Sequence, residues 1–435
     1  MTSRRVIGTY LAIAGLYTLS ASLIWGVNTL FLLAAGLTIT EVFVANAAFT
    51  AGMMLFEIPT GVVADTSGRR ISFLASIVVL FTGTLLYLWL YDIEAGVVAF
   101  SAASVLLGLG FTFYSGAVEA WLVDALATTD FDGPLDSVFA KGGYVTGAAM
   151  LVGTVGGGFL GQVSLALPYV VRAALLAIVF SLAAAGMHDV GFETRRIPLG
   201  AYPSEMRRIA LAGIRHGWDR RSVRLLMGVS FVQGGVLTWM FYAWPPYLLE
   251  LLDADAVWVA GAVAGAIAVA MMLGNGIADR LTRVCGRRST LLLWAVGVEA
   301  AAAVGMGLTS SFWAATGLLL VVMGSTGVLS PVKQGYLHQV IPSAERATVV
   351  SFDSMIGSGG SVLGQVGLGR LSDRQGLAAG YVTAGVVTAA ALPILALLRR
   401  LVEPADAIVG SSPKSACAAQ GLPEVSTVDT VPRID

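Results

Sequence analysis

The sequence is poor in charged residues. Only 12% of its 435 residues are Asp, Glu, Lys or Arg, while 56% are hydrophobic. An average soluble domain carries about 25% charged residues, so this composition argues against a soluble protein and favours a chain that crosses a lipid bilayer several times. The formal net charge is -1, and we expect no nucleic-acid partner.

Cysteine and histidine are also scarce. The two cysteines, Cys285 and Cys417, are too few for a disulfide framework, and we expect both to be free thiols on a reducing side of the membrane. The three histidines, His188, His216 and His338, form no His-Glu-x-x-His motif, and neither a nucleophile elbow nor a phosphate-binding loop is present. We therefore expect no enzyme activity, no metal site, no cofactor and no ATP drive.

Long apolar runs, by contrast, fill most of the chain. In lipid every backbone N–H and C=O must be paired internally, so each run is predicted to be helical, with breaks at Gly or Pro and above all at Pro245 and Pro246. The first run is too long for a signal peptide and is interpreted as a spanning helix. The runs form two sets of six, at 7–35, 41–64, 71–91, 96–123, 138–163, 166–187, 225–250, 257–278, 290–309, 312–339, 347–371 and 378–398.

Basic and acidic residues fall in alternate loops, which predicts an orientation. The basic side carries Arg4, Arg5, Arg69, Arg70, Lys141, Arg280, Arg283, Arg287, Arg288, Arg346, Arg399 and Arg400, and the other side carries Asp92, Glu94, Glu250, Asp253 and Asp255. By the positive-inside rule we expect a multi-pass protein of the cytoplasmic (inner) membrane with both termini in the cytoplasm. Arg370 and Arg374 fall on the other side and count against this assignment.

Two short hydrophilic motifs interrupt the apolar pattern. Residues 61–70 read Gly-Val-Val-Ala-Asp-Thr-Ser-Gly-Arg-Arg, and residues 279–288 read Asp-Arg-Leu-Thr-Arg-Val-Cys-Gly-Arg-Arg. The first resembles the loop between helices 2 and 3 of the major facilitator superfamily, and the second resembles the matching loop between helices 8 and 9. The resemblance implies an all-α membrane protein whose twelve transmembrane helices form two pseudo-symmetric six-helix bundles.

This fold divides the chain into four parts. The N-terminal bundle is expected at 1–187 and the C-terminal bundle at 225–400. The basic segment 188–224 is predicted to be a cytoplasmic linker, with either an amphipathic surface helix or a merely solvated chain. The polar segment 401–435 shows no periodicity and is predicted to be a disordered cytoplasmic tail.

In the superfamily the loop between helices 2 and 3 acts as a conformational latch, in which an aspartate faces a helix N-terminus and arginines bridge to acids. Glycine allows a tight turn there, and a carboxylate gains energy beside the positive end of a helix. The alternative is that both loops only fix the topology. The latch residues implied by the resemblance are Gly61, Asp65, Gly68, Arg69, Arg70, Asp279, Arg280, Arg287 and Arg288.

Ionisable residues inside the spans are a further signal, because each costs about 2.5 to 3.5 kcal/mol at the centre of a bilayer. Glu119 is followed in the next span by Lys141, and Lys333 by Asp353. We hypothesise that these four close a gate as one ion-pair cluster; the alternative is that each pair stays within its own half. Glu119 or Glu57 is a candidate proton carrier, and Glu57 is alternatively a brace for the latch arginines. Arg172 is expected to snorkel to the interface without a functional role.

In the resembled fold, helices 1, 4, 7 and 10 line a central cavity. Their aromatic side chains suit an amphipathic or cationic organic molecule, although anchoring at the membrane interface explains Trp and Tyr as often. The substrate-cavity candidates on these helices are Trp25, Asn28, Trp121, Gln233, Trp239, Tyr242, Gln334 and Tyr336.

A glycine-rich stretch at 153–158 partly resembles an element of the superfamily's antiporters, and close glycines let helices approach each other. The resemblance implies a monomeric secondary transporter that moves a small organic solute by alternating access in the lipid bilayer, with proton-coupled efflux as the first choice. Proton-coupled uptake stays open, and a non-transporting membrane sensor is a remote alternative.

Overall fold

The computed structural model describes residues 2–114, 116–129, 131–189, 218, 220–341 and 346–407, without the side chains of Asp65 and residues 346–348. In this part of the chain every regular element is helical, apart from one isolated bridge between Arg287 and Ala407. The predicted surface helix of the linker, most of the predicted tail and Cys417 lie outside the described residues.

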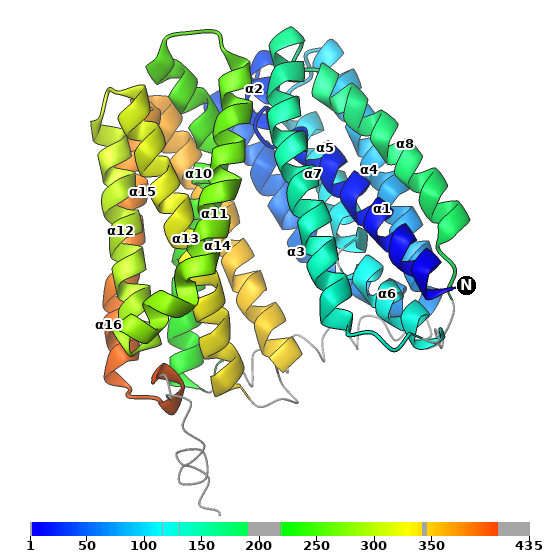
Figure 1. The fold of residues 1–435 in the computed structure, drawn as a ribbon. Coiled ribbons are helices and arrows are strands. Elements are labelled where there is room, and N and C mark those ends of the chain that lie inside the picture. The colour runs from blue at the N-terminus through cyan, green and yellow to red at the C-terminus, as the bar shows by residue number, and fades with distance from the viewer. Residues whose placement is uncertain are drawn as a thin grey trace, which may run out of the picture.

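The helices form two groups, and Figure 1 shows them as a blue-to-teal and a green-to-orange bundle. The N-terminal half contains α1 (Ser3–Ser22), α2 (Asn28–Ala34), α3 (Ile39–Ser67), α4 (Arg69–Asp92), α5 (Val97–Tyr114), α6 (Ala117–Ala127), α7 (Leu135–Val163) and α8 (Leu167–Gly186). The C-terminal half contains α10 (Arg221–Leu252), α11 (Val257–Cys285), α12 (Arg288–Leu308), α13 (Phe312–Val340), α14 (Arg346–Gln375), α15 (Leu377–Ala389), α16 (Ala391–Arg400) and the short 3-10 helix η3 (Pro404–Asp406). These elements confirm the expected fold class.

Ten of the described helical segments are long and apolar enough to cross a membrane, counting α5 with α6 and α15 with α16 as one segment each. The remaining expected spans correspond to α1 with α2, and to α14. Helix α14 has a low mean hydropathy because it carries Asp353, Arg370, Asp373 and Arg374 among many Gly and Ser residues.

Breaks divide three of the expected spans. The turn after α1 contains Gly26, and a Cβ there would lie 3.3 Å from the carbonyl oxygen of Ala260 in the other half. Gly116 has a φ of 75° just before α6, a conformation that glycine adopts without strain. The kink after α15 precedes Pro393, which has no N–H to pair with the carbonyl four residues earlier.

The expected break at Pro245 and Pro246 is wrong, because α10 runs through both residues to Leu252. Pro245 is buried, and Pro246 has no N–H to pair with the carbonyl of Tyr242 four residues earlier. The Thr29 hydroxyl donates to that carbonyl instead. Tertiary packing around Trp244 and Tyr247, both buried, holds this segment helical.

The two ends of the bundle differ. We call the end with the turns at Gly68 and Gly286, where Arg69 and Arg288 lie, the basic end, and we call the other the opposite end. Figure 1 shows the two halves leaning together at the opposite end, near α2, while the N-terminus lies toward the basic end.

Hydrogen bonds between described residues join the halves only at the opposite end and midway along the helices. Thr40 donates to Asp373 at 2.9 Å, Thr29 donates to the carbonyl of Tyr242 at 2.7 Å, and Gln365 donates to Thr50 at 3.2 Å. Gln162 also bonds the backbone at the start of α11. The described conformation therefore holds the halves together at the opposite end.

Glycines allow this close contact between the halves. A Cβ at Gly158 on α7 would lie 2.6 Å from the Cα of Gly261 on α11, and a Cβ at Gly369 on α14 would lie 2.6 Å from the Cβ of Phe43 on α3. Larger residues at either position would push the helices apart.

Candidate functional site

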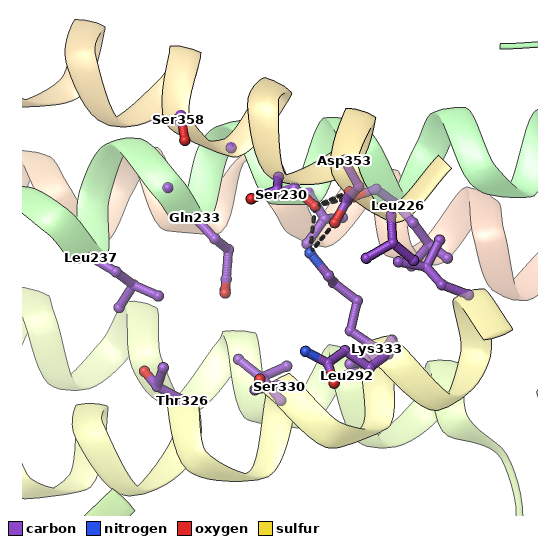
Figure 2. A pocket seen from close by; sticks show the side chains of 18 of the residues that line it. Leu226, Ser230, Gln233, Leu237, Leu292, Thr326, Ser330, Lys333, Asp353 and Ser358 are labelled. Atoms are coloured by element: carbon purple, nitrogen blue, oxygen red, sulfur yellow. Dashed lines mark hydrogen bonds and ion pairs between the residues drawn. The ribbon is translucent and has the colours of Figure 1, made fainter. Parts of the chain in front are cut away.

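A buried ion pair lies inside the C-terminal half. Lys333 on α13 donates to Asp353 on α14 at 2.9 Å, and Ser230 on α10 bonds both side chains (Figure 2). The Asp353 side chain is 9% exposed and that of Lys333 24%. Three helices therefore share one charged cluster, which a bilayer tolerates because the charges neutralise each other.

This pair lines a cavity of about 450 Å³. Gln233, Thr326, Ser330 and Gln334 supply further polar groups to its wall, and Figure 2 shows Gln233 and Thr326 on opposite sides of the space. The cavity thus combines a neutral charge pair with uncharged donors and acceptors.

Glu299 on α12 lies next to this cavity. It is 2% exposed and accepts hydrogen bonds from Gln233 at 2.8 Å and from Thr326 at 2.9 Å. Among the described residues no Lys, Arg or His forms an ion pair with it. A carboxyl group held only by neutral partners at membrane depth can bind a proton at little cost.

The predicted four-residue gate is assembled only in part. Lys333 and Asp353 pair within their own half, while Glu119 and Lys141 are both exposed and form no ion pair with any described residue. Glu57 is also exposed and braces neither Arg69 nor Arg70 in the part of the chain that is described. The gating role of all five residues stays a prediction.

The first latch loop forms a tight turn. Gly68 has a φ of 105° and connects α3 directly to α4. Arg69 lies 3.9 Å from Asp124, and the Arg70 guanidinium donates to the carbonyl of Ala184 at 2.8 Å. Gly61 is exposed, and a Cβ there would meet no described atom within 4 Å, so this glycine makes no close helix contact within the described part of the chain.

An aspartate from outside the motif faces the N-terminus of α4. Asp189, which follows α8, accepts from the backbone N–H of Arg70 at 2.9 Å, at the start of α4. The side chain of Asp65, the expected partner, lies outside the described part of the structure.

The second latch loop repeats this arrangement. Asp406, in η3 after α16, accepts from the backbone N–H and the hydroxyl of Ser289 at 2.7 Å each, at the start of α12. Arg288 donates to Gln339 at 2.9 Å and also bonds the carbonyl of Ala405. The tail predicted to be disordered from 401 therefore begins with a packed segment, because Asp406 caps a helix whose first N–H groups have no partner within the helix.

The other members of this loop are exposed. Asp279 pairs with Arg283 one helical turn away, and Arg280 and Arg287 lie on the surface. Cys285, beside them, is a free thiol. Among the described residues, no three His, Cys, Asp or Glu side chains gather as metal ligands would.

A second cavity, of about 270 Å³, lies in the N-terminal half, and Phe241 and Tyr242 of α10 complete its lining. Trp25, Asn28 and Tyr242, three of the predicted cavity residues, line it together with Arg172. The expectation that Arg172 snorkels is wrong: its residue is 7% exposed, and it donates to Thr84 at 3.2 Å and to the carbonyl of Ser20 at 3.4 Å. Its helix, α8, turns this side chain into the bundle rather than toward the lipid.

Three other predicted cavity residues lie in packed cores. Trp121 donates to the carbonyl of His188 at 2.9 Å, Trp239 packs against Phe43 at 5.8 Å between ring centroids, and Tyr336 is fully buried in the C-terminal half. None of the three lines either cavity described above. Their contact with a substrate stays a prediction.

Sequence reasoning missed Glu299, Asp189 and Asp406. Glu299 is the single charged residue of α12 after Arg288, so the same signal that selected Glu119 also applied to it. For Asp189 and Asp406 the signal was their equivalent place, shortly after the last span of each half, where an acid can reach the N-terminus of the third span.

The fold resembles those of solved transporters at low sequence identity. The nucleoside transporter NupG matches with a TM-score of 0.71 and 12% identity over 91% of this chain and 100% of that one. The peptide transporter POT with bound sulfate gives a TM-score of 0.72, 12% identity and coverages of 92% and 94%. The human organic anion transporter MFSD10 (TETRAN) gives a TM-score of 0.61 and 16% identity over 91% of this chain and 100% of that one.

No curated protein matches the sequence. The model of the Major Facilitator Superfamily matches residues 226–428, which include the C-terminal half with its latch loop. This match, the two helical halves and the fold shared with the solved transporters agree with one another. The C-terminal half therefore matches the model of this superfamily, and the chain as a whole has the fold of the solved transporters.

Proposed function

We propose that the protein is a secondary active transporter that exports a small organic solute in exchange for protons. The observation that carries the proposal is Glu299, a buried carboxyl group whose partners Gln233 and Thr326 both line the cavity of Lys333 and Asp353. Because Gln233 and Thr326 donate to the Glu299 carboxylate and also line the cavity, protonation of Glu299 would weaken these bonds and change the donors that the cavity wall presents.

The proton supplies the energy for such an exchange. One elementary charge that crosses 100 mV releases about 2.3 kcal/mol, and about 1.4 kcal/mol corresponds to a factor of ten in concentration. One proton per solute thus supports a gradient of roughly 40-fold.

Alternating access needs two halves that meet at one end at a time. The bonds between Thr40 and Asp373 and between Gln162 and α11 support a state closed at the opposite end. We assign the basic end to the cytoplasm from the arginines of the two latch loops. In the described state the solute would then enter from the cytoplasm.

The direction of transport rests on the glycine-rich part of α7. Gly153, Gly157 and Gly158 lie within contact of α1 or α11, which is the use that the antiporter-like element implies. Efflux is therefore proposed over uptake.

The test is Glu299→Gln in proteoliposomes, with Glu250→Gln as the control for an exposed carboxylate. Glutamine keeps the shape and one acceptor but holds no titratable proton. We expect E299Q to retain exchange of labelled for unlabelled solute and to lose accumulation driven by a pH gradient, while E250Q keeps both. Accumulation that still follows the pH gradient in E299Q would contradict Glu299 as the carrier.

A further inference from the structure

The second cavity carries a charge that no described acidic residue balances. Among the described residues of its lining, Arg172 is the only Asp, Glu, Lys, Arg or His, and no described Asp or Glu forms an ion pair with it. The cavity of Lys333, by contrast, holds Asp353 as a counter-charge. An arginine stays charged in proteins, so this lining carries a net positive charge.

The hydrogen bonds of Arg172 leave donors free. A guanidinium has five N–H groups, and only Nε and Nη1 have partners among the described residues, Thr84 and the Ser20 carbonyl. The remaining N–H groups suit a planar anion, which a guanidinium binds through two parallel hydrogen bonds.

A second polar group in the same lining lacks a partner. Tyr169 donates to Asn28 at 2.8 Å, and Asn28 donates to the side-chain oxygen of Asn46 at 3.0 Å. Asn46 is 3% exposed, and its Nδ2 is buried without a hydrogen-bond partner among the described residues. Buried donors are rarely left unpaired, so a missing acceptor at this place is the simplest explanation.

The rest of the lining is apolar and aromatic. Trp25 and Phe241 have ring centroids 6.4 Å apart, and both also line a neighbouring cavity of about 360 Å³. That neighbour is bounded by Met150, Trp244 and other apolar residues of α7, α10 and α11. An apolar body next to an anionic head would fit the two spaces together.

We propose that the transported solute is a small organic carboxylate with an aromatic or aliphatic body, and that Arg172 and Asn46 bind its carboxylate. This inference rests on the proposed transport function and names its substrate class. Cations are disfavoured despite the aromatic rings, because a second positive charge beside Arg172 would be repelled in a medium of low dielectric constant.

The proposal is tested by thermal unfolding of the purified full-length protein with matched probes. Indole-3-acetate, indole-3-acetamide and tryptamine share one ring system and carry an anionic, a neutral and a cationic side group; 4-phenylbutyrate, its amide and 4-phenylbutylamine form a second set. We expect only the carboxylates to raise the melting temperature, since a ligand that binds the folded state stabilises it.

Arg172→Gln should weaken carboxylate binding about 10- to 100-fold, the usual effect of losing hydrogen bonds to a charged group. Arg374→Gln is the matched control, because Arg374 is an exposed arginine at the opposite end. Asn46→Asp is a second variant that leaves Arg172 in place and gives it an internal counter-charge, so it should abolish the carboxylate shift if R172Q does not fold.

Stabilisation by the amines or amides but not the carboxylates, no shift by any carboxylate, or an unchanged shift in the Arg172 and Asn46 variants would each overturn the proposal. Glu299→Gln should keep the carboxylate shift, because equilibrium binding does not require proton coupling. Carboxylate binding together with pH-driven accumulation that persists in E299Q would thus refute the coupling and leave the substrate class standing.

Discussion

At the residue scale, burial decides how much an ion pair contributes to the stability of the protein. Asp353 and Lys333 form a pair inside the C-terminal half, whereas the Asp279 and Arg283 side chains are 77% and 65% exposed. An exposed pair contributes about 0 to 1 kcal/mol, while removing one partner of a buried pair leaves an uncompensated charge. The two pairs therefore provide a matched comparison.

Asp353→Asn is expected to lower the free energy of unfolding by about 3 to 5 kcal/mol, because Lys333 then stays buried without a counter-ion. Asp279→Asn is the control and should cost less than about 1 kcal/mol. The double variant Lys333→Met with Asp353→Asn should recover most of the loss. Thermal unfolding in detergent measures all three, and an unstable double variant would show that the pair braces the helices by more than its charge.

At the element scale, glycines decide where helices of the two halves meet. Gly158 faces Gly261 across the interface of α7 and α11, while Gly156, two residues earlier, has open space around the position of a Cβ. The glycine-rich pattern indicated close helix packing, but only the packed structure shows which of its glycines contacts the other half.

Gly158→Ala is expected to push α7 away from α11 and shift the population toward states that are open at the opposite end. Gly156→Ala should be neutral or stabilising by about 0.5 to 1 kcal/mol, since alanine favours a helix. The rate of thiol labelling of a cysteine at Gln162 measures this opening, and equal rates in the two variants would mean that the glycine contact does not hold the halves together.

At the scale of the whole molecule, the described state is one of the two that the proposed alternating access requires. The Thr40 hydroxyl and the Asp373 carboxylate meet across the halves at the opposite end, which we place outside the cell. A covalent link there would hold this state.

The variant Thr40→Cys with Asp373→Cys, in a background with Cys285 and Cys417 changed to serine, should form a disulfide with a membrane-impermeant oxidant. Transport should stop and return when the disulfide is reduced, because the halves can no longer part at this end. Each single-cysteine variant is the control. Cross-linked protein that transports normally would refute the rocking motion, and protection of the pair from the external oxidant would refute the orientation.

The sequence alone determined the class, the helical spans and the two latch loops. A bilayer requires every spanning segment to be helical and apolar, so runs such as 71–91 and 290–309 could be recognised from composition. The turns of the two latch loops could be recognised from their glycines. The spans end within a few residues of α4 and α12. These features depend on short stretches of sequence, so they can be predicted without knowledge of the tertiary structure.

Only the tertiary structure decided the roles of single charges. Arg172 lies in a cavity rather than at the lipid interface, Glu299 shares its partners with the cavity of Lys333 and Asp353, and Asp189 and Asp406, which lie outside the two motifs, accept hydrogen bonds at helix N-termini. A helix that is apolar on all sides gives no periodicity from which its inward face can be identified. Its rotation is set by packing against neighbours, and that rotation determines which charges meet, which stay alone and which reach a solute.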